Sequence, residues 1–238
     1  MTITTDTQTS STTDAGFRMA GLDLYKDIHK GIRAELFAVV GSAGSTDPGD
    51  DQGRAALAAH VRDVHGLLSM HAHHEDAAVA PHVEVALPDI AEQVEADHAE
   101  FDRRSEALVE LAVAAAAAPT DQRRLCHLLY LDLARFTGDY LAHQDLEERV
   151  IMPALEEAIG LEAVIAVHQQ IVGSIPPPEM ARSLALMLPA MNVDDRAELL
   201  GGMKATAPPE IFGGVWSLTG SVLPAPDVAA LAARLGIA

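Results

Sequence analysis

The sequence predicts an all-α protein: an up-down-up-down four-helix bundle with additional short helices after it. Composition is the first reason, because hydrophobic residues make up 49% of the 238 residues and aromatic residues only 4%. Ala, Leu and Val must therefore fill the interior, and Ala and Leu are strong helix formers. The second reason is that apolar residues recur at helical spacing in four long segments. Short connections between such segments are typical of an antiparallel bundle.

A loop rich in Gly, Asp and Pro separates the first two predicted helices. The first helix is expected over residues 21–41, and the loop GSAGSTDPGDDQG follows it. The second helix starts near Gln52, and Pro81 should end or kink it because proline lacks the N–H that a helix needs. Each predicted helix has a stripe, meaning a row of residues three or four positions apart that share one helix face. The first stripe consists of Tyr25, Ile28, His29, Ile32, Leu36 and Val39. The second consists of Leu57, Val61, Val64, Leu68, His71, Glu75 and Ala78.

The third and fourth predicted helices lie on either side of Pro119. Pro88 suits the first turn of the third helix, and Asp89 beside it favours the positive end of the helix dipole. Thr120 suits the N-cap of the fourth helix, which Pro153 should kink or end. The third stripe consists of Ile90, Val94, His98, Phe101, Ser105, Leu108 and Leu111, and the fourth of Leu125, Leu129, Asp132, Phe136, Tyr140, His143, Glu147 and Ile151.

The predicted bundle spans residues 19–160 and leaves a tail and an extension. Residues 1–18 are rich in Ser and Thr and are expected to be disordered. Residues 161–238 are expected to contain short amphipathic helices without a chemical motif, packed on the bundle or forming a subunit interface, for example in a homo-oligomer. These helices are expected near 179–190, 194–204, 208–220 and 226–235.

The charge argues against nucleic acid as a partner. The chain has 35 acidic and 16 basic residues, for a formal net charge of −19, and phosphate backbones attract the opposite sign.

No apolar run reaches the ~18 residues of a membrane span, and the N-terminus does not resemble a secretory signal. Cys126 is the single cysteine, so we expect no internal disulfide and a reducing, cytoplasmic environment.

The strongest pattern in the chain is an internal repeat. The segment HAHHEDAAVAPHVE begins at His71 and HQDLEERVIMPALE begins at His143, a shift of 72 positions. The preceding helix of each half carries one histidine on its stripe, and His29 falls on His98 with a shift of 69. The coincident pairs in the longer segments are His71 with His143, Glu75 with Glu147, Asp76 with Glu148, Val79 with Ile151, Pro81 with Pro153 and Glu84 with Glu156. The chain therefore reads as two helical hairpins, each with one His and one His-x-x-x-Glu.

This spacing predicts a metal centre. A His and a Glu four positions apart lie ~6 Å apart on one helix face and can bind the same ion. Because the face is the apolar one, the carboxylates would be buried, at a cost of several kcal/mol unless they are paired or bind metal. The predicted ligands are His29, His71, Glu75, His98, His143 and Glu147. They divide into two sets of two His and one carboxylate, which suits a pair of iron ions bridged by carboxylate, although zinc would also accept these ligands.

The pattern resembles the hemerythrin family, in particular its HHE-type cation-binding members. The segments HHEDAAVAP and HQDLEERVIMP are similar to the metal-binding helices of that family, and His29 in DIHKGIR is similar to its first ligand. The resemblance covers roughly residues 19–160 and implies a di-iron four-helix bundle. The part from residue 161 resembles the C-terminal extension of actinobacterial hemerythrin-like proteins.

The chain departs from the oxygen-carrying hemerythrins at two positions. Those proteins have His-x-x-x-His in the third helix, whereas His98 is followed at the fourth position by Asp102. They also place a carboxylate five residues after the fourth-helix histidine, which here is Glu148; we prefer Glu147 because it matches Glu75 in the repeat. The resemblance therefore points away from reversible oxygen carriage, and toward peroxide, oxygen or nitric oxide chemistry or iron sensing.

Four further residues are candidates for roles near the ions. Tyr25 is a candidate additional ligand, and Tyr140 a weaker one that could otherwise lie in the second shell; the alternative for both is core packing. Asp102 and Asp132 are candidates to accept a hydrogen bond from a ligand imidazole, and the alternative is that both are surface acids.

Three functions follow from these patterns. The leading one is a soluble di-iron protein that reacts with hydrogen peroxide or a related small oxidant. The second is a module that binds or senses oxygen, nitric oxide or iron, with the C-terminal helices responding. The third is a structural bundle without metal.

Overall fold

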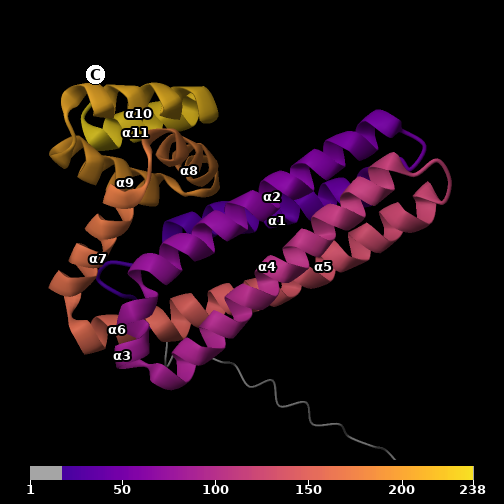
Figure 1. Ribbon diagram of the computed structural model, residues 1–238. Coiled ribbons are helices and arrows are strands. Elements are labelled where there is room, and N and C mark those ends of the chain that lie inside the picture. The colour runs from indigo at the N-terminus through magenta and orange to yellow at the C-terminus, as the bar shows by residue number, and fades with distance from the viewer. Residues whose placement is uncertain (1–17, 238) are drawn as a thin grey trace, which may run out of the picture.

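The computed structural model describes residues 18–237, and it contains helices and no strand in this range (Figure 1). The all-α class predicted from the sequence is confirmed. The tail predicted for residues 1–18 lies outside the described residues, apart from Arg18. The four long helices are α1 (Lys26–Ser45), α2 (Asp51–Ala78), α4 (Pro88–Ala117) and α5 (Gln122–Leu146).

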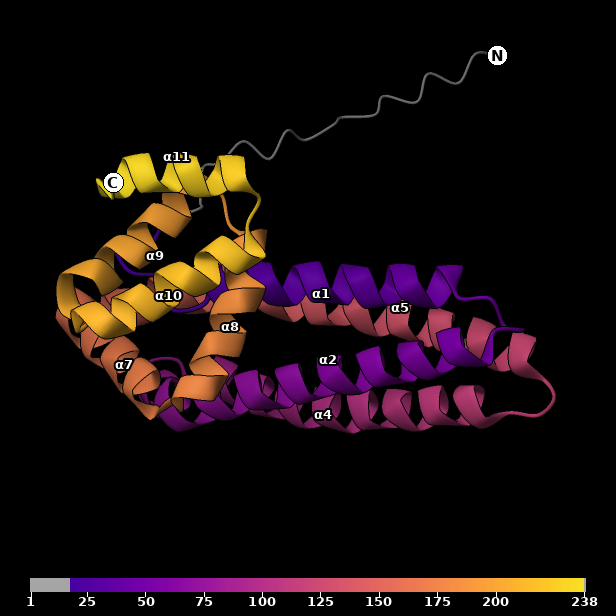
Figure 2. The same cartoon turned by 90° about the horizontal axis from the view of Figure 1, so that it is seen from above.

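These four helices, called here the long-helix core, lie side by side. Helix α1 packs against α2 and α5, and α4 packs against the same two helices. Successive long helices run in opposite directions along the core (Figure 2). Most residues of the predicted stripes face inward, with Asp132 an exposed exception. Their apolar members form two clusters. The larger one includes Ile32, Leu36, Val39, Leu57, Val61, Val64, Leu68, Phe101, Leu108, Leu129, Phe136 and Tyr140, and also Leu133, which the fourth stripe did not contain.

Two helix starts differ from the predictions. Helix α1 begins at Lys26 and not near residue 21, because the Asp23 carboxylate accepts hydrogen bonds from the backbone N–H groups of Tyr25 and Lys26, at 2.9 and 3.0 Å. Helix α5 begins at Gln122, preceded by Asp121 in the left-handed conformation with a φ of 68°. Thr120 is therefore not the N-cap of this helix.

The prolines mark a break at the same end of each repeat. Helix α2 ends at Ala78 and the short helix α3 (Ala80–Ala86) follows, with Pro81 in its first turn. Helix α5 passes into a π-helical turn, η1 (Glu147–Ile151), before α6 (Met152–Ile159), whose first turn contains Pro153. The sequence predicted the kink but not the π-helical turn, which widens the helix at a predicted ligand.

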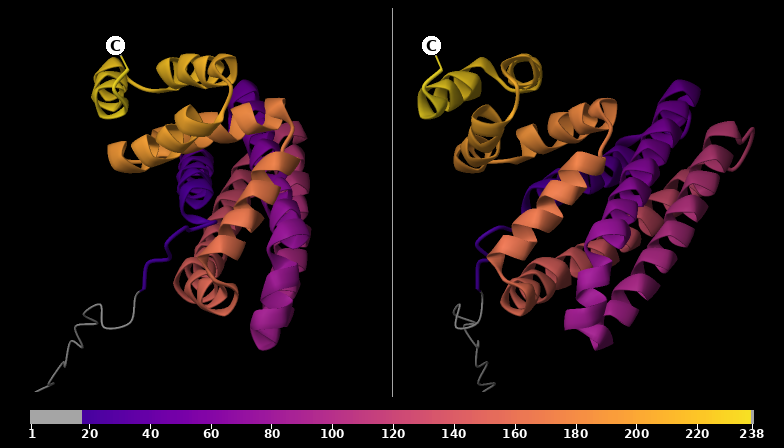
Figure 3. Two further views of the ribbon diagram at one scale, coloured as in Figure 1. Left: turned by 90° about the vertical axis from the view of Figure 1, so that its left-hand side faces the viewer. Right: turned by 60° about the vertical axis from the view of Figure 1, so that its left-hand side comes forward.

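The C-terminal part contains one more helix than predicted. Helix α7 (Leu161–Ser174) leads from the long-helix core to a group of four short helices, called here the C-terminal unit (Figure 3). The bounds of these four agree with the prediction to within two residues. They are α8 (Pro177–Ala190), α9 (Val193–Thr206), α10 (Pro209–Val222) and α11 (Ala225–Leu235). They share an apolar cluster of their own, which includes Leu184, Leu188, Leu200, Leu223 and Leu231.

The C-terminal unit packs on α1 by means of α8, and it contacts α2 through the bond between His74 and Glu179 of α8. Gly31 of α1 lies so close to α8 that an added Cβ would come within 2.9 Å of the Leu186 Cγ atom. Asp195 forms ion pairs with Lys26 and Lys30 of α1. The predicted subunit interface stays a prediction. No helix within residues 18–237 combines the length and apolar character needed to cross a membrane.

Candidate metal centre

The six predicted ligands form a buried polar layer between two apolar clusters of the long-helix core. On α2, His71 and Glu75 lie between Leu68 of one cluster and Ala78 of the other, and α5 with η1 repeats this order. Exposure is lowest for His29 at 0% and highest for His98 at 9%. The structure therefore brings all six residues to one place.

The first half-site consists of His29, His71 and Glu75, whose ligand atoms lie within 4.8 Å of one another. The two Nε2 atoms of the histidines are 3.1 Å apart, and Glu75 Oε1 is 3.0 Å from His71 Nε2. Glu147 also reaches this half-site, with its Oε2 atom 3.4 Å from His29 Nε2. The repeat thus supplies two imidazole nitrogens and two carboxylate oxygens to one point.

The second half-site mirrors the first with His98, His143 and Glu147. The Nε2 atoms of these histidines are 3.2 Å apart, and Glu147 Oε1 is 3.1 Å from His143 Nε2. Glu75 reaches across through its Oε2 atom, which is 3.4 Å from His98 Nε2. Each glutamate therefore directs one oxygen to each half-site, the arrangement that lets a carboxylate bridge two ions.

The residues present fit a metal cation. Glu75 Oε1 and Glu147 Oε2 are buried oxygens that lie close to ligand imidazole nitrogens but make no hydrogen bond of normal geometry within the described structure. Leaving such groups unpaired is costly, and buried charges in proteins are paired or bind metal. Imidazole nitrogen with carboxylate oxygen is a donor set of iron and zinc.

Comparison with protein families decides the identity of this fold. Residues 20–155 match the model of the hemerythrin HHE cation-binding domain, which is more than half of the chain. The chain belongs to this family. Searches among curated proteins and among solved structures gave no match. The family match ends before residue 161, so the resemblance of the C-terminal part to actinobacterial proteins has no support from these comparisons.

Three ligand histidines of the HHE domain are oriented by carboxylates outside the centre. The Nδ1 atoms of His29 and His98 lie 2.9 Å from Glu148 and 2.8 Å from Asp76, respectively. His143 Nδ1 lies 3.3 Å from Asp97. Such contacts leave Nε2 free to face an ion and increase its basicity.

The two acids predicted for this orienting role are elsewhere. Asp102 accepts a hydrogen bond from the Ser69 hydroxyl at 2.6 Å, because its position places it on the outer side of α4, and Asp132 is exposed on α5. In this structure both residues follow the alternative considered for them, that of surface acids. The repeat contained the better signal, since Asp76 and Glu148 coincide in it, whereas nothing in the spacing pointed to Asp97.

Glu148 was the alternative to Glu147 as a ligand, and the structure distinguishes their positions. The Glu147 carboxylate faces the centre, whereas Glu148 Oε1 bonds to His29 Nδ1 and, at 2.6 Å, to Arg33 Nη1. Glu147 is therefore the better candidate ligand in this geometry.

Both tyrosines lie against a ligand imidazole. The Tyr25 ring is 5.3 Å from the His29 ring, and the Tyr140 ring is 5.9 Å from that of His143 and 4.9 Å from that of Phe101. Burial and the nearby carboxylates raise the pKa of both phenols well above the ordinary value. Each is therefore a neutral phenol when the centre holds no metal.

Burial and hydrogen bonds shift the pKa values of the candidate ligands in different directions. Burial alone would lower the pKa of His29 and of His98, but hydrogen bonds to carboxylates outweigh it and raise both to about 9. Burial and the charge of Glu147 raise the pKa of Glu75 to about 7. The pKa of His71, by contrast, is lowered well below its ordinary value by burial. A cation that binds here replaces protons on these groups.

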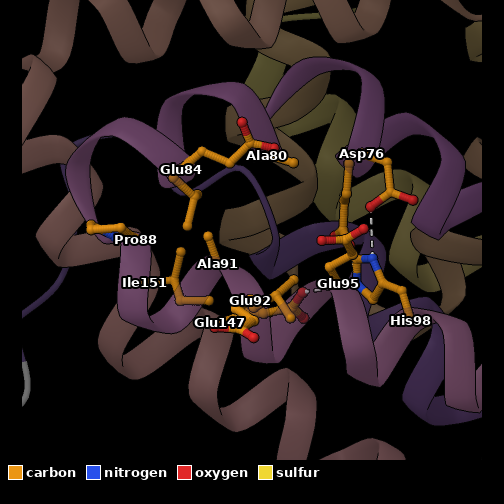
Figure 4. Close-up of a pocket in the computed structure, with 13 residues that line it drawn as sticks. Asp76, Ala80, Glu84, Pro88, Ala91, Glu92, Glu95, His98, Glu147 and Ile151 are labelled. Carbon is orange, nitrogen blue, oxygen red and sulfur yellow. Dashed lines mark hydrogen bonds and ion pairs between the residues drawn. The ribbon is translucent and has the colours of Figure 1, made fainter.

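A cavity of about 450 Å³ leads to the centre from one side, between α2, α3 and α4 (Figure 4). Its floor consists of Glu75, His98 and Glu147. The centre is therefore buried but not sealed, which a site that exchanges ions or small molecules requires.

Proposed function

We propose that this protein is a di-iron member of the hemerythrin HHE family, built as an up-down-up-down four-helix bundle, and that it decomposes hydrogen peroxide. One observation carries the proposal: two half-sites of two histidines each share both glutamates, so that each carboxylate has one oxygen for each ion.

Iron is the proposed metal because of the donor set and the symmetry. Two histidines and a carboxylate with open positions are a common setting for non-haem iron. Carboxylates and histidines that project inward from the helices of a bundle are the usual arrangement of di-iron proteins. Zinc would accept the same ligands, so the identity of the metal is a matter for measurement.

Peroxide decomposition is favoured over reversible oxygen carriage by the residue at position 102. Asp102 stands where the carriers have another histidine and, in this structure, it bonds to Ser69 and not to the centre. Each half-site thus has two imidazoles and keeps positions for an external ligand. Bound iron would supply the electrons for peroxide chemistry, while the protein orients the ligands and admits the oxidant through the cavity beside Glu75, His98 and Glu147.

The test has two stages. Protein from iron-replete cells is analysed for metal, and two iron ions per chain are expected. Oxygen evolution from hydrogen peroxide is then measured for the wild type, for His71→Gln and for His73→Gln as the matched control, because His73 is exposed and next to the ligand. We expect activity above that of free iron in the wild type and the control only.

Two results would contradict the proposal at different levels. A chain that contains no metal after growth in iron would favour a purely structural bundle. A chain with both sites filled and no activity above free iron would contradict the peroxide reaction alone and would leave metal binding intact.

A binding or sensing function is the second candidate, because the C-terminal unit contacts both helices that carry the first half-site. His74, next to the ligand Glu75, bonds to Glu179 of α8 at 2.6 Å, and Lys30, next to His29, pairs with Asp195 of α9. Hydrogen exchange of α8 and α9 with and without nitric oxide on the iron-loaded protein tests this. A change in protection that Glu179→Gln abolishes would favour sensing, and equal protection would count against it.

A further inference from the structure

The two halves of the repeat differ in their access to the centre. The cavity of about 450 Å³ lies on the side of α3 and α4, and its floor is formed by ligands that both half-sites use. On the equivalent side, α6 and the start of α1 meet without such a space: Met152 is 0% exposed and Tyr25 is 3% exposed, both within an apolar cluster.

Side-chain size explains this difference. Ala80, Ala91 and Val94 line the cavity. The shift of 72 positions relates Ala80 to Met152 in the other half. The shift of 69 positions relates Ala91 to Leu22 and Val94 to Tyr25. Each of these three residues thus has a larger counterpart, and the three counterparts pack in one apolar cluster. The difference in side-chain size accounts for a space on one side of the duplicated scaffold.

The rim of the cavity is acidic, and its charges are unpaired. Glu84, Glu92 and Glu95 are exposed on α3 and α4, and no hydrogen bond or ion pair of their side chains is found within residues 18–237. Their counterparts in the other half do have partners. Glu156 accepts a hydrogen bond from the Gly21 backbone N–H at 2.6 Å.

Asp23 and Lys26, the counterparts of Glu92 and Glu95, also have partners. Asp23 caps α1 through the N–H groups of Tyr25 and Lys26, and Lys26, the counterpart of Glu95, reverses the sign of the charge and pairs with Asp195 and Glu198. An acidic rim without partners is therefore a property of the open side alone.

The floor provides a separate indication of the ligand. Glu75 and Glu147 both line the cavity, at 8% and 1% exposure. Behind this floor, on the side of His71 and His29, each has one buried oxygen that makes no hydrogen bond in the described structure. A path from unpaired surface carboxylates to buried ones attracts a cation along its whole length, because clefts lined by one sign of charge concentrate the opposite ion.

We infer that this cavity is the route by which divalent metal ions reach the centre, with Glu84, Glu92 and Glu95 collecting the cation at the rim. The inference rests on the metal binding proposed above, but not on peroxide as the substrate. Asp76 also lines the cavity, and it orients His98 through the Nδ1 hydrogen bond, so its charge serves both the route and the ligand.

The test measures the rate of metal uptake by the metal-free, full-length protein. Cobalt(II) is the probe, because its visible absorption changes on binding, and stopped-flow mixing resolves the rate. The variant Glu84→Gln/Glu92→Gln/Glu95→Gln is compared with Asp63→Asn/Glu106→Gln/Glu110→Gln, which removes three exposed acids remote from the cavity along α2 and α4. Both variants have the same net charge, so only the position of the lost charges differs.

We expect the rim variant to take up cobalt about tenfold more slowly than the control at low ionic strength, as for other electrostatically steered associations. The difference should vanish near ~1 M salt, where charges are screened within ~3 Å. The final amount of cobalt bound should be the same in both proteins, since no ligand is changed.

A second variant blocks the cavity without changing charge. Ala80→Met/Ala91→Leu introduces the residues found at the equivalent closed positions, and Ala77→Met/Ala96→Leu makes the same changes at exposed positions of α2 and α4 outside the cavity. The blocked protein should load more slowly than its control at every salt concentration. Circular dichroism verifies that both are folded.

The outcomes separate this inference from the proposed function. Equal uptake rates for both variants and their controls, with cobalt bound in all, would overturn the access route and leave the metal centre standing. A wild-type protein that binds no cobalt or iron at equilibrium would instead refute the metal centre itself.

Discussion

The first half of the repeat, α1 to α3, and the second half, α4 to α6, hold the same ligands in different surroundings. His29 and His98 each have a carboxylate on Nδ1 at the same repeat position, from Glu148 and Asp76. His143 has Asp97, whereas Ile28 stands at the position equivalent to Asp97, and so that position offers His71 no acid. Ligand positions are thus preserved between the halves, while access and ligand orientation differ.

This comparison teaches which parts of a duplicated metal site depend on each other. In the proposed two-ion centre, a change in either glutamate would affect both half-sites, because each carboxylate contacts histidines of both. The carboxylates around them each contact one ligand histidine, Glu148 and Asp76 across the two halves and Asp97 within its own half. Variants of the glutamates and of the residues around them should therefore differ in whether they affect both half-sites or only one.

The largest effect is expected for a shared ligand. Glu147→Gln should weaken the binding of both ions by more than ~100-fold, beyond the loss typical of residues outside the ligand shell. His143→Gln should reduce binding mainly at the second half-site, because His143 contributes to that one alone. Metal analysis after dialysis is expected to give close to zero ions for Glu147→Gln and about one for His143→Gln. Equal stoichiometry in the two variants would show that the glutamate is not shared.

The closed side should lose the most stability when it is opened. Met152→Ala removes a fully buried side chain next to Pro153 and should lower the free energy of unfolding by about 2–5 kcal/mol. Val85→Ala on α3 is the control, since Val85 is 86% exposed, and surface changes of this kind are usually within about 0.5 kcal/mol. Urea denaturation of the metal-free proteins measures both. A loss below that of the control would mean that the closed side is not packed as described.

A moderate and local effect is expected for the carboxylates that orient the histidines. Asp76→Asn removes the acceptor charge at His98 and should weaken metal binding at the second half-site by roughly 10–100-fold. Glu148→Gln should act on His29 in the first half-site, and it also removes the partner of Arg33. Titration with cobalt resolves the two binding steps. If Asp76→Asn and Glu148→Gln weaken the same binding step, the two carboxylates do not act on separate half-sites.

The smallest effect is expected at Asp102. Asp102→Asn keeps the hydrogen bond from Ser69 possible and leaves the centre untouched, so the metal affinity should change less than about twofold, as for other exposed contacts. The same cobalt titration provides the measurement. A tenfold change would restore Asp102 to the orienting role that the sequence suggested.

The sequence by itself determined the helical class and the six candidate ligands that the structure brings together. Both follow from local spacing: a stripe every three or four residues defines a buried helix face, and a His and Glu at the first and fifth positions share that face. The repeat then relates His29 to His98 and Glu75 to Glu147 without any knowledge of the packing. The family match over residues 20–155 agrees with this reading.

Only the tertiary structure decided which neighbours complete the centre. The contact of Asp97 with His143 joins two helices, and the place of Asp102 depends on which way one turn of α4 faces, so spacing alone could not choose between the two roles considered for Asp102. The same holds for the cavity, because whether Ala80 and Val94 leave a space depends on the walls that α2, α3 and α4 build around them. Ligand spacing along a helix is a local property, whereas orientation, access and closure arise between helices, where distant residues meet.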